Sequence, residues 1–377
     1  MIATEPARGS PAELSPHERT RWLFRRAARA GQVHPLQRLI GLYREHEPDS
    51  LFGELDIGSG PPAHGVVAAR PLVANAALAT ISGPGAWRIC PEGLARRVGQ
   101  LPVLPQAVLQ ALALLRSDTA SDIDCAERIA IDAAMAARTL RLANSAFYGV
   151  SGRVATIRDA VVLLGRRTIG TLLATAAVAD TLARSDIAGG ADRQAAAQAM
   201  GRFWRHALGS ALAAQALASR RPPDQDVAFT TGLLHDIGQL VLGAHHASAL
   251  QAVRAAARED DADTLPIERA LLGLDHAEVG AMVARHWRFP AEVVEAIGSH
   301  HAGTPGTPAE GPVTLGDLVH VADAIAHALD LAGEPDEAVP ALDSAAWRRV
   351  ALGADEALNL LRDVENGVRV LSRSLLG

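Results

Sequence analysis

A histidine and an aspartate stand side by side in the apolar stretch TTGLLHDIGQLVL, which spans residues 230–242. The apolar residues around them recur at helical spacing and predict a helix with one face in the core of the protein. His235 and Asp236 lie within that apolar pattern, and a buried carboxylate without a cationic partner costs several kcal/mol. The pair therefore indicates a buried polar site in which something compensates the charge of Asp236.

Other histidines and aspartates occur in comparable helical contexts along the chain. The sequence has 14 histidines, and ten of them lie between residues 206 and 327. Imidazole together with carboxylate suits a borderline divalent metal such as iron, manganese, zinc or cobalt, and a helical bundle can collect such ligands from several helices into its core. The candidate metal ligands are His206, His235, Asp236, His276, His300, His301 and Asp323.

Each candidate also has a structural explanation when it is taken alone. Asp275 and Glu278 have the spacing of a helix capping box, so His276 could be a surface residue in a first helical turn. His300 and His301 end a predicted helix, where a protonated imidazole interacts favourably with the helix dipole. A single His-Asp dipeptide is a weak signal, and it is the joint pattern that favours a metal site. The pattern assigns no role to His245, His246, His286 and His327, for which we predict solvated or core-edge positions.

The bulk composition limits the class of protein. The chain has 377 residues, of which 49% are hydrophobic and 21% charged, as expected for a globular protein with a substantial core. The net charge of -6 argues against a protein that coats nucleic acid. Two cysteines allow neither a disulfide framework nor a thiolate zinc site. The sequence has no apolar signal core and no uncharged apolar run of about 18 residues, so we expect a cytoplasmic protein without a transmembrane segment.

Helical patterns dominate the chain, and sustained strand alternation is absent. We therefore predict an all-α fold. The sequence Ser15-Pro16-His17-Glu18 predicts a helix start with a capping box. The domain organisation that we expect is a helical N-terminal extension and linker in residues 1–62, a connecting segment in 63–92 that the pattern does not place, a main helical domain in 93–330, and a C-terminal helical tail in 331–377 that packs on this domain.

Several motifs resemble, in order and spacing, the HDOD domain, a regulatory relative of the HD and HD-GYP metal-dependent phosphohydrolases. They are LPVLPQAV (101–108), LRLANSAFYG (140–149), LLHDIG (233–238), HAEVGAMVARHWRFPAEVVEAIGSHH (276–301) and VHVADAIA (319–326). The resemblance covers residues 93–330 and implies an all-helical, HD-like bundle that serves bacterial signal transduction. The catalytic relatives place metal ligands at positions that match the seven candidates above, so the resemblance also implies a divalent metal such as iron, manganese or zinc.

Two departures from the catalytic relatives argue against hydrolysis. Gln239 stands where those relatives have a lysine that helps to bind phosphate, and the residues after His301, AGTPGTP, contain no tyrosine for the Gly-Tyr-Pro signature. We therefore expect a non-catalytic signalling module that binds a partner protein or a small ligand. The alternative is a metal-dependent phosphohydrolase, for example a cyclic-dinucleotide phosphodiesterase, because the set of candidate ligands is complete.

The segment RTRWLFRRAAR (19–29) predicts a basic amphipathic helix that runs to about residue 31. Such helices bind anionic membranes, nucleic acid or a partner protein. The simpler interpretation is a solvated basic face, with Trp22 and Leu23 packed on a neighbouring helix. We therefore see no strong case for a nucleic-acid partner.

Overall fold

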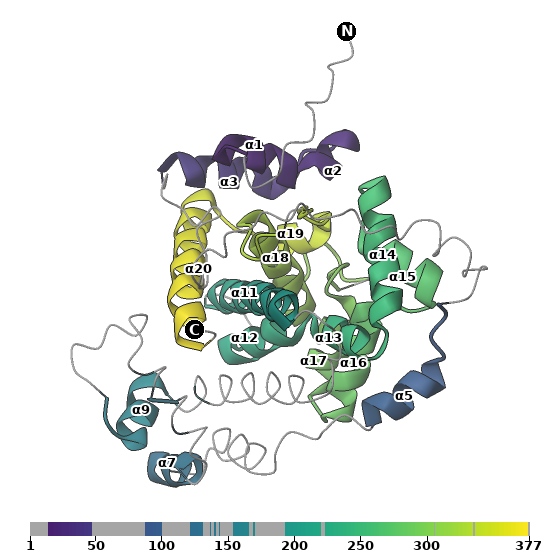
Figure 1. The fold of residues 1–377 in the computed structure, drawn as a ribbon. Coiled ribbons are helices and arrows are strands. Elements are labelled where there is room, and N and C mark those ends of the chain that lie inside the picture. The colour runs from purple at the N-terminus through teal and green to yellow at the C-terminus, as the bar shows by residue number, and fades with distance from the viewer. Residues whose placement is uncertain are drawn as a thin grey trace, which may run out of the picture.

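The structure is a computed structural model that describes residues 14–46, 87–99, 121–130, 154–165, 193–219, 223–304, 306–334 and 336–375, together with positions 136, 139, 140, 143 and 169. The described residues form helices and connecting turns without any strand (Figure 1), which confirms the all-α prediction. The motif LPVLPQAV, nearly all of LRLANSAFYG, the linker and most of the segment 63–92 lie outside the described residues.

Three helices form the centre of the bundle: α11 (Arg193–Ala218), α12 (Gln225–Leu234) and α18 (Leu315–Ala328). α11 packs against both of the others, and small residues allow a close approach. Ala211 is fully buried, and a Cβ atom on Gly232 of α12 would lie only 2.8 Å from the backbone oxygen of Ser210 in α11. The small residues of this sequence therefore bring the backbones of α11 and α12 together.

A second group of helices packs beside this centre: α13 (Ile237–His245), α14 (Ala247–Asp260), α15 (Thr264–Leu272), α16 (His276–His286) and α17 (Ala291–Ser299). α13 packs on α16, α16 on α17, and α17 on α18. Gly238 in α13 lies so close to α16 that a Cβ atom there would collide with the backbone carbonyl of His276. Glycine at this position brings the start of α13 against the start of α16.

The stretch around His235 and Asp236 differs from the single helix that its periodicity predicts. α12 ends at Leu234, the two polar residues form a turn, and α13 begins at Ile237. Asp236 is the N-cap residue of α13, but its side chain makes no capping hydrogen bond. The break in the helix therefore leaves the carboxylate available for contacts in the interior.

The same stretch is apolar enough to be compared with a membrane span. Among the described residues, Gln225–His245 is the one segment whose length and composition would allow it to cross a membrane. However, 72% of its apolar window is buried inside this bundle, and core helices of other proteins pass the same test.

Helix starts follow the sequence closely. The capping box of Ser15 and Glu18 begins α1 (Pro16–Leu23), and the box of Asp275 and Glu278 begins α16, as predicted. A third box, Thr314 with Asp317, begins α18. The prediction that His276 could be a surface residue is wrong, because this side chain is 1% exposed.

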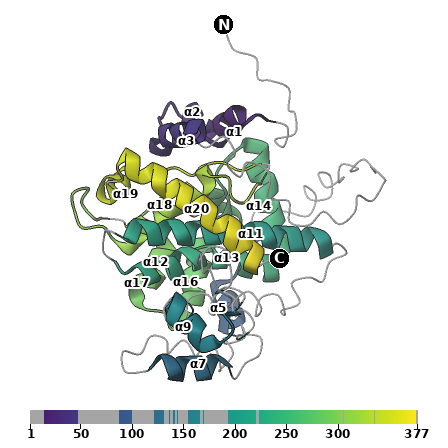
Figure 2. The same ribbon diagram turned by 90° about the vertical axis from the view of Figure 1, so that its left-hand side faces the viewer.

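The N-terminal helices lie at one end of the bundle, at the top of Figure 1. They are α1, α2 (Arg25–Arg29) and α3 (Pro35–His46). α1 and α3 contact α18, and α3 also contacts the C-terminal helix α20 (Ala354–Leu375). The view in Figure 2 shows the same arrangement from the side, with α5 (Pro91–Gly99), α7 (Asp122–Ala130) and α9 (Ile157–Leu164) at the opposite end.

The arginines of this N-terminal region bind carboxylates of the same chain, which corrects the prediction of a solvated basic face. The Nε atom of Arg19 lies 2.8 Å from Asp330, and both side chains are largely buried. Asp261 pairs with three arginines: Arg25, Arg26 and Arg29. The predicted single helix is also interrupted at Phe24, between α1 and α2. Most of the arginines that suggested an anionic partner therefore form ion pairs with carboxylates of the same chain.

The segment for which the sequence predicts a C-terminal helical tail contains two helices. α19 (Ser344–Val350) packs on α18, and α20 packs on α11. Ala351 separates them with a left-handed backbone conformation, φ 49°. The side chain of Tyr43 in α3 donates a hydrogen bond of 2.5 Å to Glu365 in α20, so helices from the N-terminal and C-terminal regions meet on this side of the bundle.

Candidate metal centre

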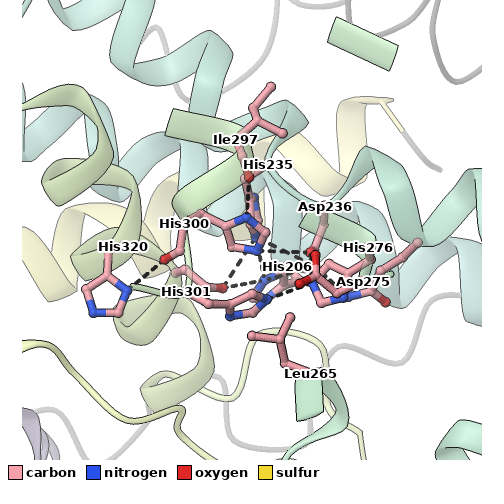
Figure 3. A network of polar contacts seen from close by, with 12 residues as sticks. His206, His235, Asp236, Leu265, Asp275, His276, Ile297, His300, His301 and His320 are labelled. Carbon is pink, nitrogen blue, oxygen red and sulfur yellow. Dashed lines mark hydrogen bonds and ion pairs between the residues drawn. The ribbon is translucent and has the colours of Figure 1, made fainter. Parts of the chain in front are cut away.

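All seven predicted ligands lie together in the interior of the bundle, although they come from five different parts of the fold. Figure 3 shows the imidazoles of His206, His235, His276, His300 and His301 around the carboxylate of Asp236. α11 provides His206, the turn between α12 and α13 provides the His-Asp pair, α16 begins with His276, the His-His pair follows α17, and α18 provides Asp323.

One side of the cluster is built around Asp323. Its Oδ1 atom lies 3.0 Å from Nε2 of His206 and 3.3 Å from Nε2 of His235. The Nε2 atoms of these two histidines are 3.3 Å apart. His206, His235 and Asp236 present ligand atoms that all lie within 4.8 Å of one another, which is close enough to share a metal ion.

The other side is built around the start of α16. The Nε2 atoms of His276 and His300 lie 3.2 Å and 3.6 Å from Oδ1 of Asp236. His301 Nε2 lies 2.7 Å from Nε2 of His276, and His276, His300 and His301 form a second group with the spacing of metal ligands. The carboxylate of Asp236 lies between the two sides, because its Oδ2 atom is 3.6 Å from His235.

Hydrogen bonds behind the imidazoles fix their orientation. The Nδ1 atom of His235 donates to the carbonyl of Gly232 at 2.6 Å, and that of His300 donates to the carbonyl of Ile297 at 2.8 Å. The Nδ1 atom of His276 lies 2.7 Å from the buried carboxylate of Glu268. In each case Nε2 is left to face the cluster. Metal-binding histidines in proteins are oriented in this way.

His320 connects the end of α17 to α18 and to the segment before α19. Its Nδ1 atom donates to the carbonyl of His300 at 2.7 Å, and its Nε2 atom accepts from the backbone N–H of Asp343 at 2.9 Å. His320 is not one of the predicted ligands, and both of its ring nitrogens bond to backbone groups and not to the cluster. Its effect is to hold the backbone that carries the His-His pair.

The electrostatics of the cluster keep its carboxylates ionised. Burial by itself raises the pKa of Asp236 and of Asp323, but the surrounding imidazoles outweigh burial and hold both pKa values well below the usual value for aspartate. Burial opposes a charge on His276, yet the carboxylates of Asp236 and Glu268 raise its pKa well above the usual value. In this structure, therefore, protons on imidazoles compensate the buried negative charge.

The two histidines of the His-His pair have the protonation state of a metal ligand. Burial, together with the charge of neighbouring imidazoles, lowers the pKa of His300 and of His301, so both are neutral near pH 7. The buried atoms His300 Nε2 and Asp236 Oδ1 make no hydrogen bond of good geometry, although Nε2 of His276 lies 3.2 Å from that oxygen. Buried polar atoms without such a bond are costly unless another partner satisfies them. A divalent cation coordinated by both atoms fits this requirement and the chemistry of the donor set.

Three further residues contact the cluster through interactions that the sequence did not predict. Glu268 lies on α15 in a segment without a motif, so no local signal could have found it. The amide Nε2 atom of Gln239 donates to Oδ2 of Asp236 at 3.0 Å. His327 occupies the edge of the core as predicted, with its side chain 24% exposed, but its Nε2 atom lies 3.3 Å from Oδ1 of Asp323. Its spacing of four residues from Asp323, which places both on one helix face, was the signal that could have found it.

A family model of the HDOD domain matches residues 101–303, which is more than half of the chain. This chain belongs to the HDOD family. The matched range of the HDOD protein contains the candidate ligands from His206 to His301, whereas the candidate Asp323 follows it. The resemblance stated from the motifs is therefore confirmed.

Solved structures with the same fold include proteins named for hydrolysis and for signalling. The HDOD protein is 28% identical to a candidate phosphohydrolase from Shewanella amazonensis SB2B, with a TM-score of 0.51 over 72% of this chain and 97% of that one. A candidate signal transduction protein from Marinobacter aquaeolei VT8 is 22% identical, with a TM-score of 0.60 over 79% of this chain and 64% of that one. An HDOD domain protein from Geobacter sulfurreducens is also 22% identical, with a TM-score of 0.58 over 75% of this chain and 96% of that one. At 22% identity the likeness shows the fold alone.

A relative from Treponema pallidum (strain Nichols) is 26% identical over 219 residues, which are 58% of this chain. The match covers 40% of that protein, so this chain spans less than half of the relative's length.

Proposed function

We propose that this HDOD protein is a cytoplasmic signalling module, built around a buried divalent-metal centre, that binds a partner protein or a small ligand without catalysis. The observation that carries the proposal is the orientation of the buried imidazoles. The Nε2 atoms face one another and two carboxylates, and three of the Nδ1 atoms are held from behind by oxygen acceptors. That orientation is typical of metal ligands.

The donor set indicates the class of metal. Five imidazoles and two carboxylates, without a thiolate, suit iron, manganese or zinc. His206 and His235 would hold an ion on one side of Asp236, and His276, His300 and His301 would hold an ion on the other. The carboxylate of Asp236 has one oxygen near each group, which supports a position between two ions.

Metal analysis of the purified full-length chain tests the centre. We expect at least one divalent ion per chain to remain after dialysis, and Asp236→Asn to lose it. His286→Ala provides a matched control, because His286 is a partly buried histidine on α16 that lies about 15 Å along the helix axis from His276. A wild-type chain that holds no metal after expression in metal-supplemented medium, and that takes up none in a titration, would overturn the proposal.

Gln239 supports a role without catalysis. Its neutral amide donates a hydrogen bond to Asp236, at the position where the catalytic relatives have a lysine. Cleavage of a phosphodiester needs positive charge to receive the phosphate, and an amide does not supply it. The likeness to a candidate signal transduction protein, although limited to the fold, agrees with a signalling role.

A second candidate function is a metal-dependent phosphohydrolase. The position of Asp236 between two ligand groups favours it, as does the 28% identity with a candidate phosphohydrolase. Two divalent ions at such a site supply a nucleophile from water and stabilise the leaving group of a phosphodiester. Assays of the metal-loaded chain with cyclic dinucleotides and with a generic phosphodiester separate the two functions. Turnover that is lost in His235→Ala would establish the enzyme, and no turnover by protein that holds metal would support the module.

A further inference from the structure

His327 lies beside the cluster in a position that none of the motifs assigns. It is one helical turn after Asp323 on α18, and the Nε2 atom of His327 is 3.3 Å from Oδ1 of Asp323. Its ring centroid is 4.4 Å from that of His206. The ligand atoms of His206, Asp323 and His327 all lie within 4.8 Å of one another. These three residues therefore have the spacing of metal ligands, and His206 also belongs to the group that contains Asp236.

A buried glutamate orients His327 from behind. The Nδ1 atom of His327 bonds to the carboxylate of Glu337, whose side chain is 6% exposed. The arrangement repeats that of His276, in which Nδ1 bonds to Glu268 and Nε2 faces an aspartate of the cluster. Among the described residues, His276 and His327 both have this arrangement, and each lies between a glutamate and an aspartate.

The segment that carries Glu337 is held in place by the N-terminal helices. Arg25 donates to the backbone carbonyl of Glu337 at 2.6 Å, and Arg19 donates to that of Glu334 at 2.6 Å. The backbone N–H of Val339 donates to the carbonyl of Leu23 at 2.9 Å. Glu337 is therefore fixed by contacts on both sides of its position in the chain, and so is the imidazole that it orients.

We infer that His327 is an additional metal ligand and that, with His206 and Asp323, it completes the coordination of a divalent ion at this end of the cluster. The inference rests on the proposed metal centre and extends it beyond the ligands that the family resemblance supplies. The competing explanation is an imidazolium that compensates the charges of Asp323 and Glu337 without any metal. The two explanations can be separated by measurement. Removal of a metal ligand changes the affinity and the absorption spectrum of the bound ion, whereas removal of an imidazolium that only compensates charge does not.

Titration with Co²⁺ tests the inference, because cobalt suits imidazole and carboxylate ligands and its visible absorption reports the ligands around it. Binding is followed by calorimetry and by absorption in the full-length wild type, in His327→Ala and His327→Gln, and in the control His286→Ala. The glutamine variant keeps a hydrogen-bond donor toward Glu337, and circular dichroism checks that each variant is folded. We expect both His327 variants to bind one ion at least about 100-fold more weakly, with altered absorption, since loss of a ligand should exceed the 10- to 100-fold effect of the residues behind it.

Each outcome of this titration has a distinct meaning. A wild type that has been freed of bound metal with a chelator and then binds no Co²⁺ overturns the proposed metal centre and the inference with it. A wild type that binds Co²⁺, with folded His327 variants whose affinity and absorption match the wild type, overturns the inference alone and leaves the metal centre in place. Weaker binding and altered absorption in both His327 variants, with the His286 control unchanged, support the inference. Glu337→Gln should then weaken binding by about 10- to 100-fold.

Discussion

Two aspartates on α18, six residues apart, are both buried and are compensated in different ways. Asp317 is fully buried and forms two hydrogen-bonded contacts with the guanidinium of Arg349, of 2.8 Å and 2.5 Å. It also accepts from the backbone N–H groups of Thr304 and Thr314. Arginine keeps its charge at every pH at which proteins fold, so this carboxylate has a permanent partner.

Asp323 is 2% exposed, and the cationic partners recorded for it are imidazoles: His206, His235 and His327. An imidazole can give up its proton and bind a metal through the same nitrogen. The comparison teaches that burial of a carboxylate does not by itself indicate a functional site. A carboxylate paired with a guanidinium stabilises the fold, whereas one paired with several imidazoles can exchange protons for a metal ion.

The largest effect that we expect is the loss of stability when Arg349, the permanent partner of Asp317, is removed. Arg349→Leu leaves the carboxylate of Asp317 buried and unpaired, which should lower the free energy of unfolding by about 3–5 kcal/mol. Denaturant unfolding measures it, and the loss should be the same with and without a chelator. The control is Arg348→Leu at the exposed neighbouring position, for which we expect a change within about 0.5 kcal/mol. A similar, small loss for both variants would show that the ion pair is not important for stability.

The next largest effect concerns Asp323, whose imidazole partners can exchange their protons for a metal ion. A metal ion at 100 times its dissociation constant should stabilise the wild type by about 2.7 kcal/mol. Asp323→Asn removes a ligand and should abolish that gain, while its metal-free form should lose less stability than Arg349→Leu, because the imidazoles can lose their protons. Thermal unfolding with and without Mn²⁺ measures both quantities. An undiminished metal-induced gain in Asp323→Asn would contradict the assignment of this carboxylate.

A smaller effect is expected from the residue behind His276. Glu268→Gln keeps the shape of the side chain but removes the charge that orients and polarises the imidazole. We expect metal affinity to fall about 10- to 100-fold, as calorimetric titration would measure. The matched control is Glu295→Gln, at an exposed position on α17, which should leave the affinity unchanged.

The last prediction concerns how the contribution of Asp317 to stability changes with pH. Burial alone would raise the pKa of Asp317, but Arg349 and the N–H donors outweigh it and lower that pKa. Because the folded pKa lies below the unfolded value of about 3.9, the carboxylate stabilises the fold above that pH and loses its contribution as pH falls through the folded pKa. The difference in unfolding free energy between wild type and Asp317→Asn should be constant from about pH 5 to 8 and shrink below about pH 4. A difference that grows on acidification would show that the sign is wrong.

Local features were the ones that the sequence predicted well. Capping boxes at Ser15 and Asp275 depend on residues three positions apart, and both are present in the structure. The all-helical fold follows from apolar periodicity within single helices. The turn at His235 and Asp236 was missed because the apolar pattern continues across it, while the break depends on the contact of Gly238 with α16. The role of Arg25 was missed for a related reason, because its partner Asp261 is 236 residues away along the chain.

The sequence by itself determined that this protein is helical, that it carries HDOD motifs, and which seven residue types and positions are candidate ligands. Only the tertiary structure decided that these side chains meet, that Asp236 lies between two groups of them, and that Glu268, His327 and Glu337 adjoin them. The physical reason is the distance along the chain between the residues that interact. Backbone hydrogen bonds and helix caps are set by residues a few positions apart, whereas the direction in which one helix presents a side chain to another depends on how the whole bundle packs.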